Sequence, residues 1–179
     1  MPKSMKTLLA DQINNLYSAE NQVARALPVM ARSASNEHLR VALEQHLEET
    51  GGQAERLTRA AQILTSEFDG KVCKGMRGLL DEGREVAEEG GDANVIDAAL
   101  IAVAQRIEYY EIAAYTTAEA IAEQLGETEI VQLLQATLYE EFEADEVLSD
   151  LLRHVILPAP GAMVQPSGHS HPAPQQGAR

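Results

Sequence analysis

The 179-residue chain contains a single cysteine, Cys73. One cysteine excludes a disulfide within the chain, which fits a reducing compartment. The first twelve residues also lack an apolar run long enough for a signal peptide or a membrane-spanning helix. We therefore expect a cytoplasmic protein.

Basic residues are scarce in this chain. Only 14 Lys and Arg stand against 28 Asp and Glu, so the formal net charge is -14. Nucleic acids and anionic membrane surfaces are bound through basic patches, and the charge balance therefore argues against both as partners. A negative surface would instead raise the local concentration of cations, although it also serves plain solubility.

Hydrophobic residues make up 45% of the chain and recur at alternating steps of three and four. This spacing is typical of helices that bury one face. It predicts four long helices, over about residues 4–32, 35–68, 92–126 and 128–157. The residues predicted to cap the last three helices are Ser35, Asp92 and Thr128.

The stretch 69–91 separates two pairs of predicted helices and contains six glycines. An amphipathic piece near residues 76–86 predicts a short helix within a long crossover. This arrangement indicates an all-α, four-helix bundle of ferritin-like connectivity. Residues 1–157 would form the bundle, and residues 158–179, rich in Pro, Gly, Ser and Gln, a disordered tail that contains histidines.

A carboxylate interrupts each apolar stripe about halfway along its helix. The four residues are Glu20, Glu49, Glu111 and Glu141. Because their heights on the helices match, they should meet at one level of the bundle core. A buried carboxylate must be protonated, paired or bound to a cation, and these stripes carry no matching set of Lys or Arg. The pattern therefore predicts bound metal ions.

The two halves of the chain repeat this placement of carboxylates. Glu49 and Glu141 are 92 residues apart (141 − 49), and Glu20 and Glu111 are 91 apart (111 − 20). The repeat predicts a dinuclear site with pseudo-two-fold symmetry. Oxygen ligands favour iron or manganese, or failing those magnesium or calcium, over zinc or copper. The full set of predicted metal ligands is Glu20, Glu49, Gln53, Glu108, Glu111, Glu141 and Asp145.

Three further side chains lie one helical turn from predicted ligands: His46, Tyr17 and Tyr115. His46 precedes Glu49 by three residues and could bind metal or orient Glu49, and we favour the supporting role. The two tyrosine hydroxyls could donate hydrogen bonds to ligand carboxylates, although such side chains more often simply pack.

Four segments carry these residues: YSAENQ from Tyr17, HLEETGGQAERL from His46, QRIEYYEIAAY from Gln105 and TLYEEFEAD from Thr137. Together they resemble the YciE/YciF family of ferritin-like proteins, over about residues 7–157. The resemblance implies a four-helix bundle, a di-iron-type site at the residues above, a ferroxidase role and an association with bacterial stress responses. The chain departs from the broader ferritin-like pattern, which has histidine where Gly52 and Ala144 stand here.

Three functions agree with these features. The first is a ferroxidase-like oxidoreductase, in which two bound iron ions are oxidised by O2 or H2O2. The second is a non-enzymatic stress protein with a structural metal site or a proton-sharing cluster. The third is a manganese enzyme that disproportionates peroxide. We expect metal ions and O2 or H2O2 as partners, and a homodimer, since long helices with alanine-rich outer positions can pack across a two-fold axis.

Overall fold

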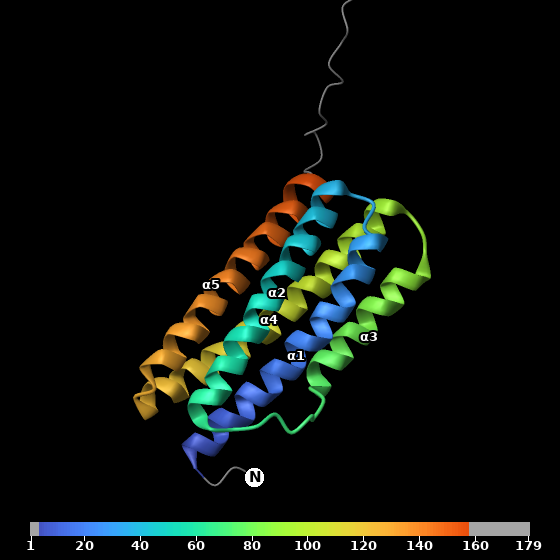
Figure 1. The fold of residues 1–179 in the computed structure, drawn as a ribbon. Helices are drawn as coiled ribbons and strands as arrows, with labels where there is room; N and C mark the ends of the chain where they lie inside the picture. Colours follow the sequence, from blue (N-terminus) through green and yellow to red (C-terminus); the bar gives the residue numbers. More distant parts are fainter. Residues whose placement is uncertain (1–3, 158–179) are drawn as a thin grey trace, which may run out of the picture.

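Five α-helices and a π-helical turn make up residues 4–157, the part of the chain that the computed structural model describes (Figure 1). The elements are α1 (Met5–Ser33), α2 (Glu37–Leu64), α3 (Lys74–Glu89), α4 (Ala93–Leu125), α5 (Thr128–Asp150) and the π-helix η1 (Leu151–Ile156). The predicted tail lies outside the described residues, so its disorder and the domain boundary at residue 157 stay predictions.

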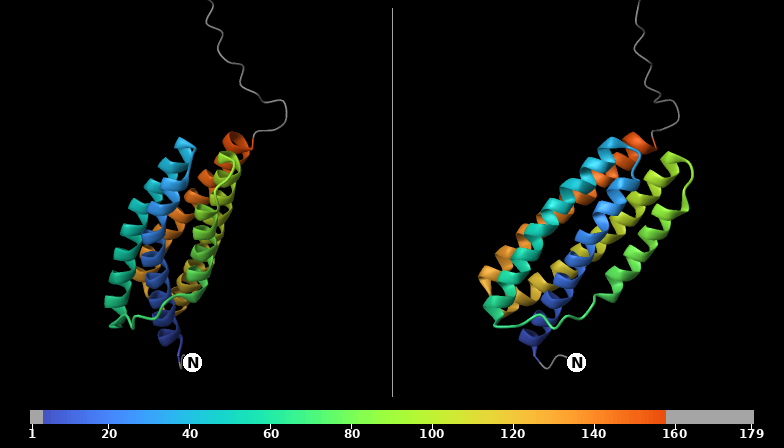
Figure 2. Two further views of the ribbon diagram at one scale, coloured as in Figure 1. Left: turned by 90° about the vertical axis from the view of Figure 1, so that its right-hand side faces the viewer. Right: turned by 45° about the vertical axis from the view of Figure 1, so that its right-hand side comes forward.

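The chain forms two antiparallel helix pairs, and α3, which connects them in sequence, runs back along the length of the bundle (Figure 1). α1 and α2 form the first pair, and α4 and α5 form the second. α1 also packs on α4, and α2 packs on α5, while α3 lies outside against α1 and α4 (Figure 2). The predicted all-α bundle with a helix in its crossover is therefore confirmed.

Polar side chains cap the beginnings of α2 and α4, but not that of α5. Asp92 accepts hydrogen bonds from two amides of the first turn of α4, as the sequence predicts. The other two predicted caps are wrong. Asn36, not Ser35, caps α2 with its side chain, and Thr128 is the first residue of α5, which begins without a side-chain cap.

Asp97 of α4 fixes the turn between α1 and α2. Its carboxylate is buried and accepts the amide hydrogens of Ser35 at 2.8 Å and Asn36 at 2.9 Å. Ser35 therefore contributes its backbone to this turn, and its neighbour takes the capping position. The first helix pair is anchored to the second at this end of the bundle.

Two glycines bring α3 close to α4. A Cβ atom at Gly75 would lie 2.8 Å from Cε2 of Tyr110, and one at Gly83 would lie 3.0 Å from Cγ1 of Val103. Real Cβ atoms rarely approach another heavy atom so closely. Part of the glycine content of the crossover therefore serves helix packing.

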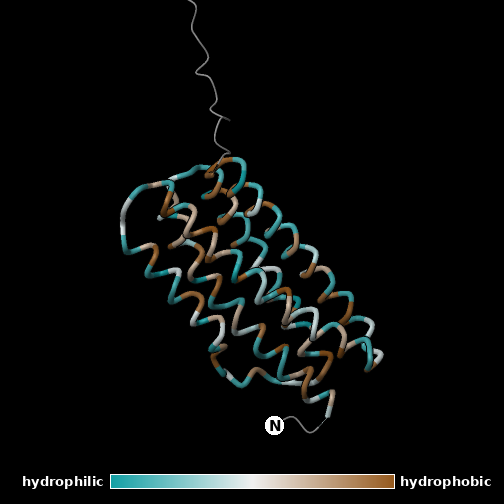
Figure 3. The backbone as a smooth tube through the Cα atoms, turned by 180° about the vertical axis from the view of Figure 1, so that it is seen from behind, coloured by the Kyte–Doolittle hydropathy of each residue, from teal (hydrophilic) through white to brown (hydrophobic). Residues whose placement is uncertain are grey.

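The apolar core consists of two separate clusters. One lies toward the turn between α1 and α2 and includes Val23, Leu43 and Leu100. The other lies toward the opposite end and includes Ile13 and other residues such as Leu57, Tyr115 and Leu134. Hydrophobic and hydrophilic residues alternate along each helix, as in helices that bury one face (Figure 3). A layer of buried polar side chains separates the two clusters, which is the level that the interrupted stripes predict.

The end of the last helix departs from the predicted stripe. The stripe has Val155 inside, but Val155 is exposed and Ile156 is buried. These residues belong to η1, whose hydrogen bonds span five residues instead of four. Each residue of a π-helix turns through a smaller angle, so the inward position moves one residue along the chain.

Within residues 4–157, no helix is both long and apolar enough to cross a membrane.

We expect Asp97→Ala to lower the free energy of unfolding by about 2–4 kcal/mol, because two amides in a buried turn lose a charged acceptor. Asp97→Asn keeps one acceptor oxygen and should lose less. Chemical denaturation of the three proteins measures the difference. An alanine variant as stable as the natural protein would show that the turn does not depend on this contact.

Candidate metal centre

The polar layer is built from all four long helices of the bundle. Its fully or almost fully buried members are Glu20 from α1, His46, Thr50 and Gln53 from α2, Glu108 and Glu111 from α4, and Thr137 and Glu141 from α5. On each helix the buried glutamate or histidine lies between residues of the two apolar clusters, for example Glu141 between Leu138 and Leu148. The layer therefore lies in the centre of the bundle, closed above and below by hydrocarbon.

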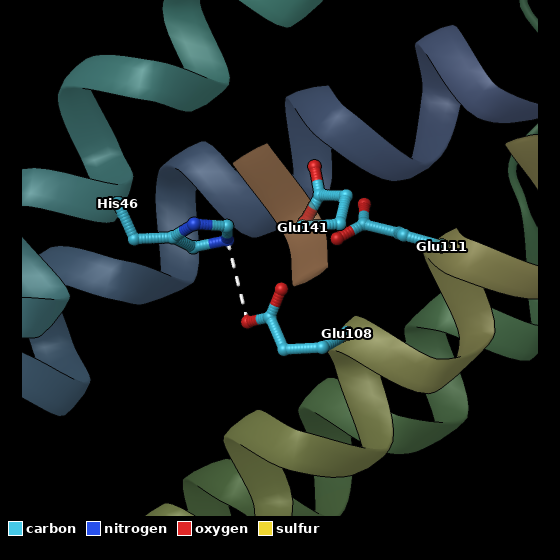
Figure 4. Close-up of side chains that lie close together, drawn as sticks. All are labelled: His46, Glu108, Glu111 and Glu141. Atoms are coloured by element: carbon cyan, nitrogen blue, oxygen red, sulfur yellow. Dashed lines mark ion pairs between the residues drawn. The ribbon is translucent and has the colours of Figure 1, made fainter. Parts of the chain in front are cut away.

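Four of these side chains converge on one point (Figure 4). His46, Glu108, Glu111 and Glu141 each offer one ligand atom, and these atoms all lie within 4.8 Å of one another. Nε2 of His46 lies 3.5 Å from Oε1 of Glu108. The group combines three carboxylates and one imidazole, a donor set suited to first-row transition metals.

Many polar atoms of this layer have no hydrogen-bond partner. Among the described residues, they include both carboxylate oxygens of Glu111 and Glu141 and both ring nitrogens of His46. One oxygen each of Glu20, Glu108 and Gln53 is likewise unpartnered. Buried polar atoms in proteins are nearly always satisfied, so each such atom needs an explanation. Cations held between these atoms would satisfy all of them, and the residues therefore fit a metal site.

Burial raises the pKa of all four buried glutamates above its ordinary value, because it disfavours the ionised form. Burial is the largest cause at Glu20, Glu108, Glu111 and Glu141. The charge of Glu141 raises the pKa of Glu20 and Glu108 further, and the charge of Glu20 does so for Glu111. Ionised together, these groups repel one another in a medium of low dielectric constant.

His46 lies inside the cluster, although the sequence alone favours a supporting role for it. Between Leu43 and Leu57 of α2, the buried positions are His46, Thr50 and Gln53. Glu49 is offset from His46 by about 60° around the helix axis, since three residues turn through about 300°. The imidazole therefore points inward and the carboxylate lies beside it at the edge of the layer.

Glu49 is 30% exposed, unlike the other three carboxylates that interrupt the stripes. Its Oε1 accepts a hydrogen bond from Gln45 at 2.9 Å, and its Oε2 lies 3.8 Å from Nδ1 of His46. His46 and then Gln45 lower the pKa of Glu49. The surroundings of Glu49 thus favour its ionised form, whereas burial disfavours the ionised form of the other glutamates.

Gln53 and Asp145 differ in how deeply they lie. Gln53 is fully buried, and its amide nitrogen donates to Glu140 at 3.2 Å while its oxygen stays unpartnered. Asp145 is half-buried and accepts a hydrogen bond from Gln105 at 3.0 Å. Gln53 therefore belongs to the layer, and Asp145 lies at its edge.

The two tyrosines predicted to support the site have different surroundings. Tyr115 is buried and its hydroxyl donates a hydrogen bond to Oε1 of Glu20. Tyr17 stacks on Phe68 with ring centroids 3.8 Å apart, and among the described residues its carbonyl oxygen accepts a hydrogen bond from Asn21, outside the cluster. Phe68 lies beyond the end of α2, which stops at Leu64 and not near residue 68 as predicted.

The repeat between the two halves of the chain is broken at the site. Glu49 corresponds to Glu141 at an offset of 92 residues, yet only Glu141 is buried. The same offset places His46 opposite Leu138, which belongs to an apolar cluster. The site therefore has an imidazole on the side of α2 and no equivalent on α5.

The fold and the buried cluster together define a ferritin-like helical bundle with a candidate di-metal site. A solved structure described as ferritin-like, diiron-carboxylate proteins from Bacillus anthracis str. Ames matches with a TM-score of 0.67. Its identity is 18%, and the match covers 84% of this chain and 99% of that chain. At this identity the likeness shows the fold.

Sequence comparison gives the family. Protein YciF of Escherichia coli (strain K12) is 44% identical over 153 residues, which cover 83% of this chain and 90% of that protein. A crystal structure described as that of the E. coli stress protein YciF matches with a TM-score of 0.81 and 42% identity, over 84% of this chain and 95% of that one. The model of the family described as "Domain of unknown function (DUF892)" matches residues 4–158. The chain belongs to this family, which includes YciF.

The metal-free protein should lose stability as the pH rises. The buried glutamates have folded-state pKa values raised above their ordinary value of 4.5. Their protonated forms therefore stabilise the fold fully below that value, and this contribution is lost as the pH rises through the raised pKa values. Thermal unfolding of chelator-treated protein from about pH 5 to about pH 9 measures the trend.

The control for this prediction is the double variant Glu111→Gln and Glu141→Gln, which removes two of the titrating groups and should flatten the pH dependence. Bound cations favour the ionised acids, so metal-loaded protein should also keep its stability over the same range. If the stability of the metal-free protein stays level or increases with pH, the interpretation that these carboxylates are buried and repel one another is wrong.

Proposed function

We propose that this protein binds two iron ions in the polar layer and oxidises Fe(II) with O2 or H2O2 as part of a stress response. The observation that carries the proposal is the set of buried atoms without partners. Apart from Ser66 Oγ, all such side-chain atoms among the described residues belong to this one layer. An apolar core tolerates such a set only if something neutralises and binds it.

The proposed ligands are the deeply buried members of the layer. Glu20, Glu111 and Glu141 each come from a different helix, so carboxylates could hold two cations from several sides. Glu108 and His46 would complete the set on the side of α2 and α4, with the imidazole as a nitrogen donor. Gln53 offers its free amide oxygen to the same space. Glu49 and Asp145, also predicted as ligands, lie at the edge.

The proposed reaction has Fe(II) as its substrate. Two Fe(II) ions lose one electron each, and one molecule of H2O2 takes up these electrons and two protons to give two molecules of water. The protein supplies negative charge, which stabilises the ferric product, and a site closed by apolar clusters. Tyr115 holds the carboxylate of Glu20 in position through its hydrogen bond. The raised pKa values mean that metal binding should release protons.

Metal titration of single variants tests the proposed ligands. Chelator-treated natural protein should bind two equivalents of Fe(II) per chain under anaerobic conditions, and Glu111→Gln or Glu141→Gln should lose at least one. Glutamine resembles the protonated acid, so these variants should fold. Glu44→Gln changes an exposed residue of α2 and should bind like the natural protein. Full binding by both buried variants would place the metal elsewhere.

Oxidation kinetics test whether the site turns over. Adding O2 or H2O2 to the Fe(II)-loaded protein should produce ferric absorbance faster than in free Fe(II) at equal concentration and pH. Glu141→Gln should fall to the rate of free Fe(II), because it lacks the complete site. Bound iron that oxidises no faster than free iron would favour the non-enzymatic alternative, a stress protein with a structural metal site.

The metal found in protein purified from its natural host would separate iron from the manganese alternative, a peroxide-disproportionating enzyme.

The cytoplasmic location stays a proposal and rests on the single cysteine, which is buried. The homodimer also stays a proposal. Exposed aromatic side chains on α4 and α5, among them Tyr109, Tyr139 and Phe142, offer apolar surface for such a contact.

A further inference from the structure

A cavity of about 200 Å³ leads from the surface between α2 and α5 to the polar layer. Its walls include the exposed Glu143 of α5 and the partly exposed Glu49 of α2. They also include His46 and Glu108, which are buried members of the cluster. One continuous space therefore joins solvent-exposed carboxylates to the candidate metal centre.

The polar side chains of this cavity form a series of decreasing exposure. Glu49 is 30% exposed, His46 is 6% exposed and Glu108 is 2% exposed. Oε2 of Glu49 lies 3.8 Å from Nδ1 of His46, and Nε2 of His46 lies 3.5 Å from Oε1 of Glu108. Neither ring nitrogen of His46 has a hydrogen-bond partner. A cation could pass along this series and keep at least one ligand at each step.

A small residue on α5 leaves space in the cavity. Ala144 of α5 lies three residues after Glu141, the position at which the broader ferritin-like pattern has histidine, and it lines the cavity. A larger side chain there would extend into the space beside His46. The missing histidine thus coincides with an opening to the layer.

We propose that this cavity is the route by which divalent cations reach the buried carboxylates, with Glu49 as a transit ligand that is not part of the final site. The inference rests on the proposed function, because it assumes that cations bind in the layer. Glu49 and Glu143 attract the cation at the mouth, and His46 receives it at the inner end. This assigns Glu49 a role in the rate of loading, in place of a role in the number of ions bound.

The test uses the full-length, chelator-treated protein and Co²⁺, whose visible absorbance reports binding without oxidation. Stopped-flow mixing gives the rate of uptake, and a separate titration gives the number of ions bound. Glu49→Gln and Ala144→Leu should each slow uptake on the order of tenfold and leave the stoichiometry unchanged. Glu48→Gln, an exposed neighbour that does not line the cavity, is the matched control and should load at the natural rate.

Salt dependence separates attraction by charge from obstruction. Added salt should slow uptake by the natural protein, and less so in the double variant Glu49→Gln and Glu143→Gln, because salt screens the carboxylates at the mouth. In Ala144→Leu the salt dependence should persist, since both carboxylates remain.

Two outcomes would overturn the inference. Uptake at the natural rate in both Glu49→Gln and Ala144→Leu would mean that cations enter elsewhere. A loss of bound Co²⁺ in Glu49→Gln, equal to that in Glu141→Gln, would make Glu49 a permanent ligand. Failure of the natural protein to bind Co²⁺ or Fe(II) at all is a different result, because it removes the proposed function itself.

Discussion

Four glutamates that would carry like charges are buried in one layer of this bundle. Glu20, Glu108, Glu111 and Glu141 lie between two apolar clusters, where an ionised carboxylate is expensive and four together repel one another. Burial raises the pKa of each of them, and either a proton or a bound cation would remove the cost of the buried charge. Stability, proton uptake and metal binding are therefore coupled in this bundle, because each acts on the same few side chains.

The rest of the fold holds these carboxylates in place. The apolar clusters on either side pack the helices and set the height of the polar layer. Asp97 ties the turn between α1 and α2 to α4, and the glycines of α3 let the crossover helix lie close against α4. None of these contacts belongs to the site, yet they fix the positions of the helices that carry it. The polar layer costs stability that such packing must offset.

The two edges of the layer differ, and this difference has chemical consequences. On α2 an imidazole points inward and a carboxylate lies beside it, whereas on α5 the carboxylate points inward and an alanine lines the cavity. His46 takes a position at which the other half of the chain has Leu138. An internal repeat can thus place the same residue types at the same spacing and still give a site with one accessible side.

Periodicity in the sequence was sufficient for the helices, the connectivity and the level of the polar layer, because helical spacing alone places Glu20, Glu111 and Glu141 on buried stripes. The long glycine-rich crossover between two helix pairs indicated the ferritin-like connectivity, and the family resemblance implied the same fold. Only the tertiary structure decided that His46 points inward and that Glu49 lies at the edge of the layer. A residue at the edge of a stripe turns inward or outward according to how its helix is rotated against its neighbours. The cap at Asn36 and the register of η1 were likewise settled by long-range contacts and local winding that no periodic pattern encodes.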